Sequence, residues 1–449
     1  MGNETSSVKI HSLLTAEDIK GLRAGFPGGG NGPPPAHLDW GHWTCWPAEE
    51  KAGLEKIMST EVGHITFHSY QEVSGNVIRG QSDARVKFLF RLLDRPVDKT
   101  ITSTDLFQLI THLVDTAVQL ILGEDHAQPD IGVQTRETSR VLAESLMHEL
   151  VFPKDSPKSS LHRKFSEDLY LDFDMVERWL VMKCPLVDEI LLFTLAKSFG
   201  IPVNSSAGMK RPPLVPLRGL EFKSNTWLQP QEVIFLNANL TGDLRGLWRP
   251  LFNSRIHGES FSKLAGAILK KGANFVIVWE KNGYCFGGYV SSSWNLGPKF
   301  VGDNSCFLFS LLPKMFHYEA TRFNTNYMYM NLKQKTLPNG LGMGGQFDFF
   351  GLWIDSEYGK GRCAPSCSSY TSPQLSKEEQ FQIEHIEVWG VGEEPIEDED
   401  ENTRSVFDMD PETQAVMEMM GKTYVSKDMK AADEQLAKER ANQERSQTS

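Results

Sequence analysis

Hydrophobic residues recur at helical spacing through the first half of the chain. In one stretch, Leu106, Ile110 and Leu113 follow each other at intervals of four and three residues, so one face of a helix would be apolar. Similar patterns run from Ala48 to about Gly200. The pattern predicts an all-helical region over residues 48–203.

The pattern changes to short apolar runs beyond residue 213. Residues 274–280 read as a strand, and Asn282-Gly283 after it is typical of a type I′ hairpin turn, in which both central residues need a positive φ. Residues 284–290 would then return antiparallel. Further runs suggest a helix at 261–269 and strands at 306–310, 327–330, 349–354 and 381–391. The predicted fold class is α+β, with an antiparallel β-sandwich and flanking helices following the helical region.

The remaining segments are predicted as linkers and tails. Residues 26–47 combine a Gly/Pro run with three tryptophans, and such a run cannot hold a helix or a ladder. We therefore assign residues 1–47 to a flexible N-terminus and linker. A second Pro-rich linker, at 210–216, precedes the β-rich domain, which covers residues 214–393. After it we expect an acidic linker, 394–409, and a C-terminal helix, 410–445, which is either a frayed polar tail or a helix ordered by a partner.

Composition and charge narrow the class of protein. The chain has 449 residues and a formal net charge of -12, which argues against nucleic acid as a partner because phosphates attract basic surfaces. Six scattered cysteines favour a reducing, intracellular location. We find no run of 18 uncharged apolar residues, and therefore expect no transmembrane helix.

The first six residues match a lipidation signal. Gly2 after Met1, with Ser6 at the required offset, fits the pattern for N-myristoylation; the alternative is an ordinary flexible terminus. One myristoyl chain binds membranes only marginally, with a constant of about 10⁴ M⁻¹. We therefore expect a protein partner to supply the second attachment.

Between two predicted helices lies a loop with the length of an EF-hand. Asp94, Asp98 and Asp105 fall at its positions 1, 5 and 12. However, Pro96 at position 3 offers no side-chain oxygen, and Lys99 stands where the sharp turn favours glycine. The pattern predicts an EF-hand-like helix pair that does not bind calcium; a calcium-gated sensor is the alternative.

Five segments in order give the β-rich half a family resemblance. It resembles the TLDc family in the stretches Trp248–Phe261, Cys285–Trp294, Phe300–Ser310, Gly344–Asp355 and Glu384–Gly392. The order of Gly2, helical half, TLDc domain and helical tail is similar to the lysosomal, mTOR-associated type of member.

The resemblance implies a function in binding. TLDc domains are β-sandwiches flanked by helices, and members protect cells from oxidative stress or bind the V-ATPase. From the resemblance we expect a regulatory adaptor on the cytoplasmic face of the lysosomal membrane, with a cytoplasmic pool. Its expected partners are V-ATPase subunits, mTOR complex components and, through myristate, the lysosomal membrane. The family provides no catalytic residues to transfer.

A glycine-rich segment is the main candidate docking edge. Residues 339–345 contain G-x-G-x-x-G, but Pro338 precedes the motif and a strand-like run follows it, whereas a dinucleotide site needs a strand before it and a helix after it. We therefore expect a loop with positive φ and no cofactor. The predicted partner-binding residues are His257, Gly258, Asn339, Gly340 and Gly342.

No catalytic or metal set emerges from the remaining residues. Cys363 and Cys367 would supply only two ligands of the four that a structural zinc site needs. Ser260 lacks the closing glycine of a nucleophile elbow. We predict no enzyme and no metal. The alternative is an antioxidant protein with a reactive cysteine, for which Cys285 and Cys306, with Cys363, are candidates, although the first two are expected to be buried.

Overall fold

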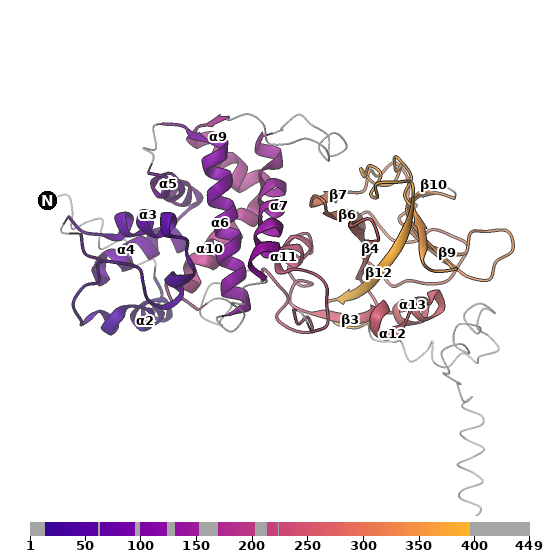
Figure 1. The fold of residues 1–449 in the computed structure, drawn as a ribbon, viewed down its shortest axis with the longest axis horizontal. Coiled ribbons are helices and arrows are strands. Elements are labelled where there is room, and N and C mark those ends of the chain that lie inside the picture. Colours follow the sequence, from indigo (N-terminus) through magenta and orange to yellow (C-terminus); the bar gives the residue numbers. More distant parts are fainter. Residues whose placement is uncertain are drawn as a thin grey trace, which may run out of the picture. The chain divides into compact units, whose positions relative to one another are not determined.

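The computed structural model describes residues 14–61, 63–94, 99–123, 131–151, 169–202, 213–222, 224–347 and 349–395. The chain divides into two compact units (Figure 1). The helical unit comprises Met1–Leu247 with Pro313–Phe316, and the sheet unit comprises Trp248–Leu312 with His317–Ser449. The predictions for Gly2, Asp98 and the C-terminal helix at 410–445 lie outside the described residues.

The helical unit contains the helices predicted from periodicity. Its long amphipathic helix α6 (Ser103–Leu122) packs against α7 (Ile131–Val151) and α10 (Pro185–Ser198). By length and composition α6 could cross a membrane, but the described structure buries its apolar face, including Leu106 and Leu113, in the core. The other elements are α2 (Ala16–Gly25), η1 (Pro27–Gly30), η2 (Gly41–Cys45), α3 (Ala48–Met58), α4 (Phe67–Ile78), α5 (Ser82–Leu92), β1 (Ile101–Thr102), β2 (Tyr170–Leu171), α9 (Phe173–Arg178), the π-helix η4 (Trp179–Lys183) and α11 (Pro230–Ala238).

Residues 26–47 differ from the predicted linker. They form two short 3₁₀ helices, and Trp43 lies fully buried at their centre. The ring of Trp43 meets that of Phe199 edge-on, with centroids 5.0 Å apart. The indole N–H of Trp46 donates to Ser198 Oγ at 2.8 Å. The Gly/Pro run has no helical period, but its aromatic residues bury enough apolar area to fold the segment into the helical core.

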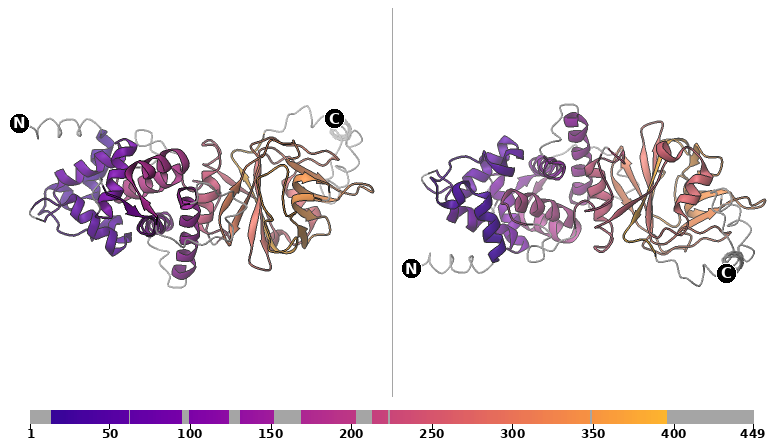
Figure 2. Two further views of the ribbon diagram at one scale, coloured as in Figure 1. Left: turned by 90° about the horizontal axis from the view of Figure 1, so that it is seen from above. Right: turned by 90° about the horizontal axis from the view of Figure 1, so that it is seen from below.

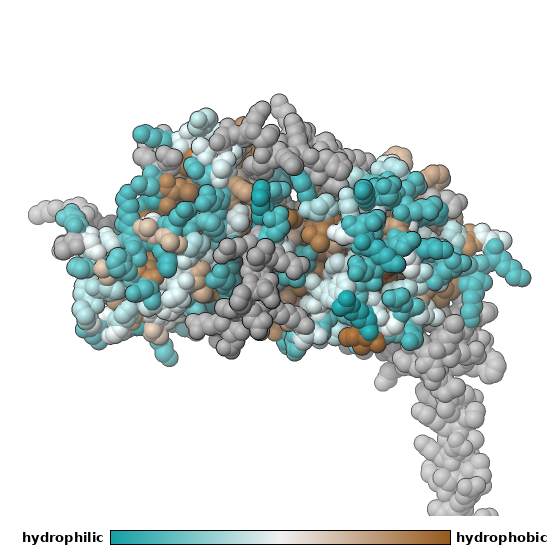
Figure 3. Space-filling model, in the orientation of Figure 1, coloured by the Kyte–Doolittle hydropathy of each residue, from teal (hydrophilic) through white to brown (hydrophobic). Residues whose placement is uncertain are grey.

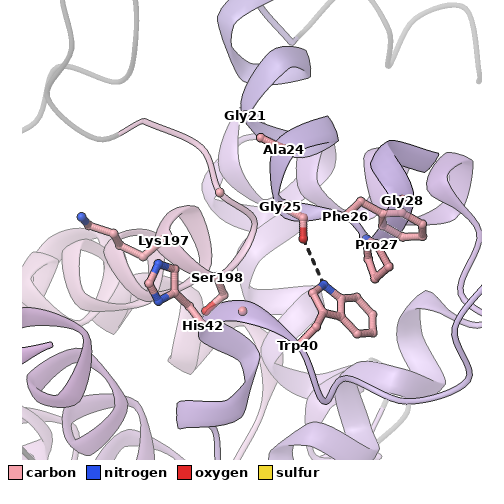
Figure 4. A pocket seen from close by; sticks show the side chains of 12 residues that line it. Gly21, Ala24, Gly25, Phe26, Pro27, Gly28, Trp40, His42, Lys197 and Ser198 are labelled. Carbon is pink, nitrogen blue, oxygen red and sulfur yellow. Dashed lines mark hydrogen bonds between the residues drawn. The ribbon is translucent and has the colours of Figure 1, made fainter. Parts of the chain in front are cut away.

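The same segment borders a hollow on the helical unit. This hollow has a volume of about 610 Å³. Trp40 lines the hollow and donates its indole N–H to the carbonyl of Gly25 at 3.1 Å (Figure 4). Phe26 and Pro27 lie on the same side as Trp40, whereas His42 and Lys197 lie on the other. Part of the predicted linker therefore lines a hollow on the surface of the helical unit.

The loop of the EF-hand-like helix pair forms a short β-pairing with a second loop of the chain, which the sequence pattern did not reveal. Ile101, at loop position 8, pairs antiparallel with Leu171. Thr102 then caps α6 through the backbone N–H of Asp105, and Asp172 caps α9 in the same way through Met175. The two loops that lead into α6 and α9 are therefore joined by the two-stranded sheet of β1 and β2.

The first part of the predicted 214–393 domain belongs to the helical unit by its contacts. Every residue of α11 except Ala238 is buried, and the helix packs on α6 and α7. The Arg245 guanidinium is 4% exposed and bonds both carboxylate oxygens of Glu189, at 3.2 and 2.6 Å. Removing one partner of such a buried pair leaves the other charge uncompensated, which is strongly destabilising.

The sheet unit confirms the α+β fold class. Its antiparallel strands follow the order β7-β6-β5-β4-β12-β11-β10-β9-β8, and β3 pairs with β12. Figure 2 shows the unit from two opposite sides. Its elements are β3 (Trp248–Asn253), α12 (Ser254–His257), α13 (Phe261–Ile268), β4 (Asn274–Glu280), β5 (Cys285–Val290), β6 (Phe307–Leu312), β7 (Phe316–Tyr318), β8 (Met328–Asn331), β9 (Gly340–Gln346), β10 (Phe349–Asp355), β11 (Lys360–Arg362) and β12 (Gln380–Val391).

The long strand β12 belongs to both halves of the sheet. Its first residues pair with β11, and its remainder pairs with β4 on one side and β3 on the other. Strands that are distant in this order also pack face to face, because a Cβ on Gly288 of β5 would lie 2.2 Å from Met343 Sδ of β9. The sheet thus closes on itself as a sandwich.

The β4–β5 hairpin is as predicted, but its turn type is not. Within the turn, Gly283 has a φ of 83° and Asn282 does not have a positive φ. The backbone N–H of Glu280 donates to the carbonyl of Tyr284 at 2.8 Å, which leaves a three-residue loop. Such loops place only their last residue in the left-handed region.

Candidate partner-binding surface

The turn between β3 and α13 holds two predicted partner-binding residues. Asn253 ends β3, and its side-chain oxygen accepts the N–H of Arg255 at 3.0 Å, which begins the single helical turn α12. Gly258 closes that turn with a φ of 88°, and its N–H donates to the carbonyl of Ser254 at 2.8 Å. A glycine suits this position because left-handed backbone strains other residues.

A buried polar network anchors α12 to the sheet. Ser254 Oγ lies 2.7 Å from His385 Nδ1, and His385 Nε2 lies 3.1 Å from Glu387 Oε1. The indole N–H of Trp389 donates to Glu387 Oε2 at 2.9 Å. His385 and Glu387 have no solvent exposure. Sequence reasoning missed these residues, although His385, Glu387 and Trp389 alternate along β12 and so share one face.

The hydrogen-bond directions in this network follow from the donors and acceptors available. A carboxylate can only accept, so His385 Nε2–H donates to Glu387. In its neutral form His385 then accepts the Ser254 hydroxyl at Nδ1, and Ser254 Oγ itself accepts the N–H of Ile386 at 3.2 Å. The Ser–His–Glu order resembles a hydrolytic triad, but Ser254 is only 3% exposed. The network therefore fits an anchor better than a nucleophile.

The outer side of α12 presents an apolar residue among charged ones. Ile256 is 68% exposed, between exposed Arg255 and His257. Figure 3 shows a hydrophobic spot over the α12 region, surrounded by hydrophilic surface. Lys263 donates its Nζ to the His257 carbonyl at 2.9 Å, which adds a second cation to this edge. We call Arg255, Ile256, His257 and Lys263 the α12 surface.

His257 is held in place on this surface. Its ring stacks on Phe252 with centroids 5.5 Å apart, and its Nδ1 accepts the N–H of Asn253 at 3.0 Å. Ser260 instead lies 3.1 Å from Ser262, oxygen to oxygen. The His257–Ser260 segment leads into a helix as predicted, since Ser260 is the N-cap residue of α13.

The glycine-rich segment is a strand and not an exposed loop, so that part of the docking prediction is wrong. Gly340 and Gly342 are buried in β9. A Cβ at Gly342 would lie 2.5 Å from Phe350 Cε1, and one at Gly340 would lie 2.4 Å from the Ile354 carbonyl oxygen. These glycines admit neighbouring rings and backbone, as the expected close approach required. Positive φ, which was also expected, occurs at Gly340, at 157°, and further along at Gly344 and Gly345, at 71° and 80°.

Asn339 also serves the fold. Its amide Nδ2 donates to the Gln334 carbonyl and its Oδ1 accepts the Gln334 N–H, both at 2.8 Å. This reciprocal pair closes the loop before β9. Of the five predicted partner-binding residues, the structure therefore brings His257 and Gly258 together and places the other three elsewhere.

The cysteines considered for peroxide chemistry are buried. Cys285, Cys306 and Cys363 are at most 1% exposed, and burial raises the pKa of the Cys363 thiol well above its usual range. Burial likewise raises the pKa of Cys184 to about 12. A thiol reacts as its thiolate, so burial disfavours this chemistry at Cys184 and Cys363.

The described part of the EF-hand-like loop carries other contacts. Asp94 has a φ of 53° and pairs with Lys56, Nζ to Oδ1, at 2.5 Å. Asp105 lies in the first turn of α6. The Asp94 carboxylate thus forms a surface ion pair, and Asp105 belongs to the start of a helix.

Comparisons with known proteins place the chain in a family. A model of the TLDc domain matches residues 222–392. The protein named "MTOR-associated protein MEAK7" from Homo sapiens is 41% identical over 374 residues, which cover 80% of this chain and 78% of the relative. Its namesake from Gallus gallus is 33% identical, covering 82% and 79%. "Oxidation resistance protein 1" from Yarrowia lipolytica is 27% identical over 43% of this chain and 86% of its own length. This chain belongs to the MEAK7 family of TLDc-domain proteins.

Proposed function

We propose that the protein is a non-catalytic adaptor that docks a regulatory complex through the α12 surface. The observation that carries the proposal is Ile256, a 68% exposed aliphatic side chain on a turn fixed from below by Ser254 and His385. An apolar residue held rigidly at the surface binds a partner at low entropic cost. Arg255 and Lys263 favour an acidic rim on that partner.

The proposed partners are mTOR complex components and V-ATPase subunits. The MEAK7 relatives are named as mTOR-associated proteins, which supports the first. The TLDc resemblance supports the second. A lysosomal location follows from both, with Gly2 myristate as a weak anchor and the docked complex as the second attachment. Binding, and not catalysis, is then the role of the TLDc domain.

The test is capture from lysosome-enriched membranes with the full-length chain. We compare wild type with Ile256→Asp and use Phe323→Asp as the matched control, since Phe323 is an exposed hydrophobic residue of the same unit at 85% exposure. Point variants are preferable to deleting residues 214–393, because the deletion would remove α11 from the helical core. Wild type and Phe323→Asp should recover V-ATPase or mTOR components, and Ile256→Asp should recover at least tenfold less.

Two outcomes would count against the proposal in different ways. Full recovery by Ile256→Asp would remove the α12 surface from the interface and leave the adaptor role standing. Absence of both complexes from wild-type captures under gentle lysis would overturn the adaptor role itself.

The reactive-cysteine hypothesis is the second candidate because one relative is named "Oxidation resistance protein 1". Among the cysteines, Cys45 is the one that is only half-buried. Purified protein that turns over peroxide, and loses this activity in Cys45→Ser, would favour the enzyme over the adaptor.

A further inference from the structure

A cluster of side chains with metal-binding chemistry lies between α3 and α6 in the helical unit. Glu49 and Glu50 occupy the first turn of α3. Gln108 and His112, one turn apart, share a face of α6. His112 Nδ1 lies 2.5 Å from Glu50 Oε1, and Gln108 Nε2 donates to Glu49 Oε2 at 3.1 Å. Gln108 and His112 thus each contact one glutamate of α3.

The second carboxylate oxygen of Glu50 lacks a hydrogen-bond partner in the described structure. The Glu50 side chain is 7% exposed, and its Oε2 is buried without a hydrogen-bond partner in the described structure. An unsatisfied buried acceptor is destabilising, and most such groups in proteins are satisfied. A bound cation would supply the missing partner.

The donor atoms lie close to metal-binding geometry. One ligand atom each from Glu49, Glu50 and His112 lies within 4.8 Å of the other two. Bonds of about 2.0 Å in a tetrahedral site place donors about 3.3 Å apart. The Glu50–His112 pair would open slightly from its present 2.5 Å, and the His112 side chain, at 24% exposure, has room to do so. Exposed Glu49 leaves a solvent side for water as the fourth ligand.

The charge of this cluster and the chemistry of its donor atoms indicate which class of ion it would bind. Two carboxylates face one imidazole, and the nearby Asp115 adds another negative charge. One nitrogen and two oxygen donors suit Zn²⁺ or a similar transition-metal ion and do not suit Ca²⁺, which prefers oxygen alone. We propose that Glu49, Glu50 and His112 form a binding site for a divalent transition-metal ion of the Zn²⁺ class.

This site could not be predicted from the sequence, because its halves are 62 residues apart and match no metal motif. Binding would replace the proton shared by His112 and Glu50 with the metal ion. The ion would also join α3 to α6, so it should stabilise the helical unit against unfolding.

The test uses full-length protein stripped with a chelator and titrated with Zn²⁺ by calorimetry and with Co²⁺ by visible absorption. Wild type should bind one equivalent, show tetrahedral Co²⁺ bands and gain thermal stability. His112→Ala and Glu49→Gln should each weaken binding at least tenfold. Since Glu49 is exposed, its variant should fold even if His112→Ala does not. Exposed His64 provides the control, His64→Ala, which should bind as wild type does.

The proposal is overturned if wild type binds no equivalent of Zn²⁺, or if folded Glu49→Gln binds as tightly as wild type. Equal loss in His64→Ala would also overturn it, since binding would then be non-specific.

Discussion

At the scale of single residues, Glu387 controls how firmly the α12 surface is held. It accepts hydrogen bonds from His385 and Trp389 at a position without solvent exposure. Its removal leaves two buried donors without an acceptor, and each such group costs about 1–3 kcal/mol. We expect Glu387→Ala to lower the free energy of unfolding of the sheet unit by about 2–5 kcal/mol, measured by urea denaturation.

A control lies on the same strand. Glu384 of β12 is exposed, so Glu384→Ala should change stability by less than about 0.5 kcal/mol. Equal effects of the two variants would contradict the anchoring role of Glu387.

His112 should make the stability of the helical unit depend on pH. Its hydrogen bond to Glu50, aided by the charges of Glu50, Glu49 and Asp115, raises the pKa of His112 above its ordinary value of 6.5. Stability from the charged pair is therefore fully present below pH 6.5 and is lost as pH rises through the raised pKa. In chelator, the stability difference between wild type and His112→Gln should be larger at pH 5.5 than at pH 8.5. A difference that grows with pH would contradict this sign.

At the scale of elements, Trp43 tests whether residues 26–47 belong to the helical core. Trp43 is fully buried against Phe199 and Tyr70. Truncating a buried tryptophan costs about 3–5 kcal/mol, and we expect Trp43→Ala to lower unfolding stability by that amount. Thermal or urea unfolding measures it. The adjacent, exposed His42 supplies the control, and a small effect of Trp43→Ala would restore the linker interpretation.

Periodic elements were predictable, whereas elements built from glycine or isolated aromatics were not. α6 and β4 follow apolar spacing directly, because burial of one face or both faces determines that spacing. β9 has four glycines at positions that face rings or backbone, so its sequence reads as a loop. Among the candidate site residues, His257 and Gly258 stood out by local turn chemistry, but Ser254 and His385 are 131 residues apart and meet only in the folded sheet.

At the scale of the whole molecule, membrane association should need two weak attachments. A single myristoyl group binds with a constant of only about 10⁴ M⁻¹, and linked contacts multiply each other's effect. We expect Gly2→Ala and Ile256→Asp each to reduce the lysosomal fraction in cells, and the double variant to abolish it. Fractionation measures this, with Phe323→Asp as control. A Gly2→Ala variant that stays fully membrane-associated would contradict the lipid part.

The position of β12 also sets the order in which the chain can be completed during synthesis. This strand is the last described strand in sequence, yet it lies between β4 and β11 and also pairs with β3. Until residues 380–391 leave the ribosome, β3 and β4, which are made much earlier, must wait with unpaired edges. Such late pairing of distant strands slows folding and leaves strand edges exposed to aggregation. We therefore expect the nascent sheet unit to depend on a chaperone.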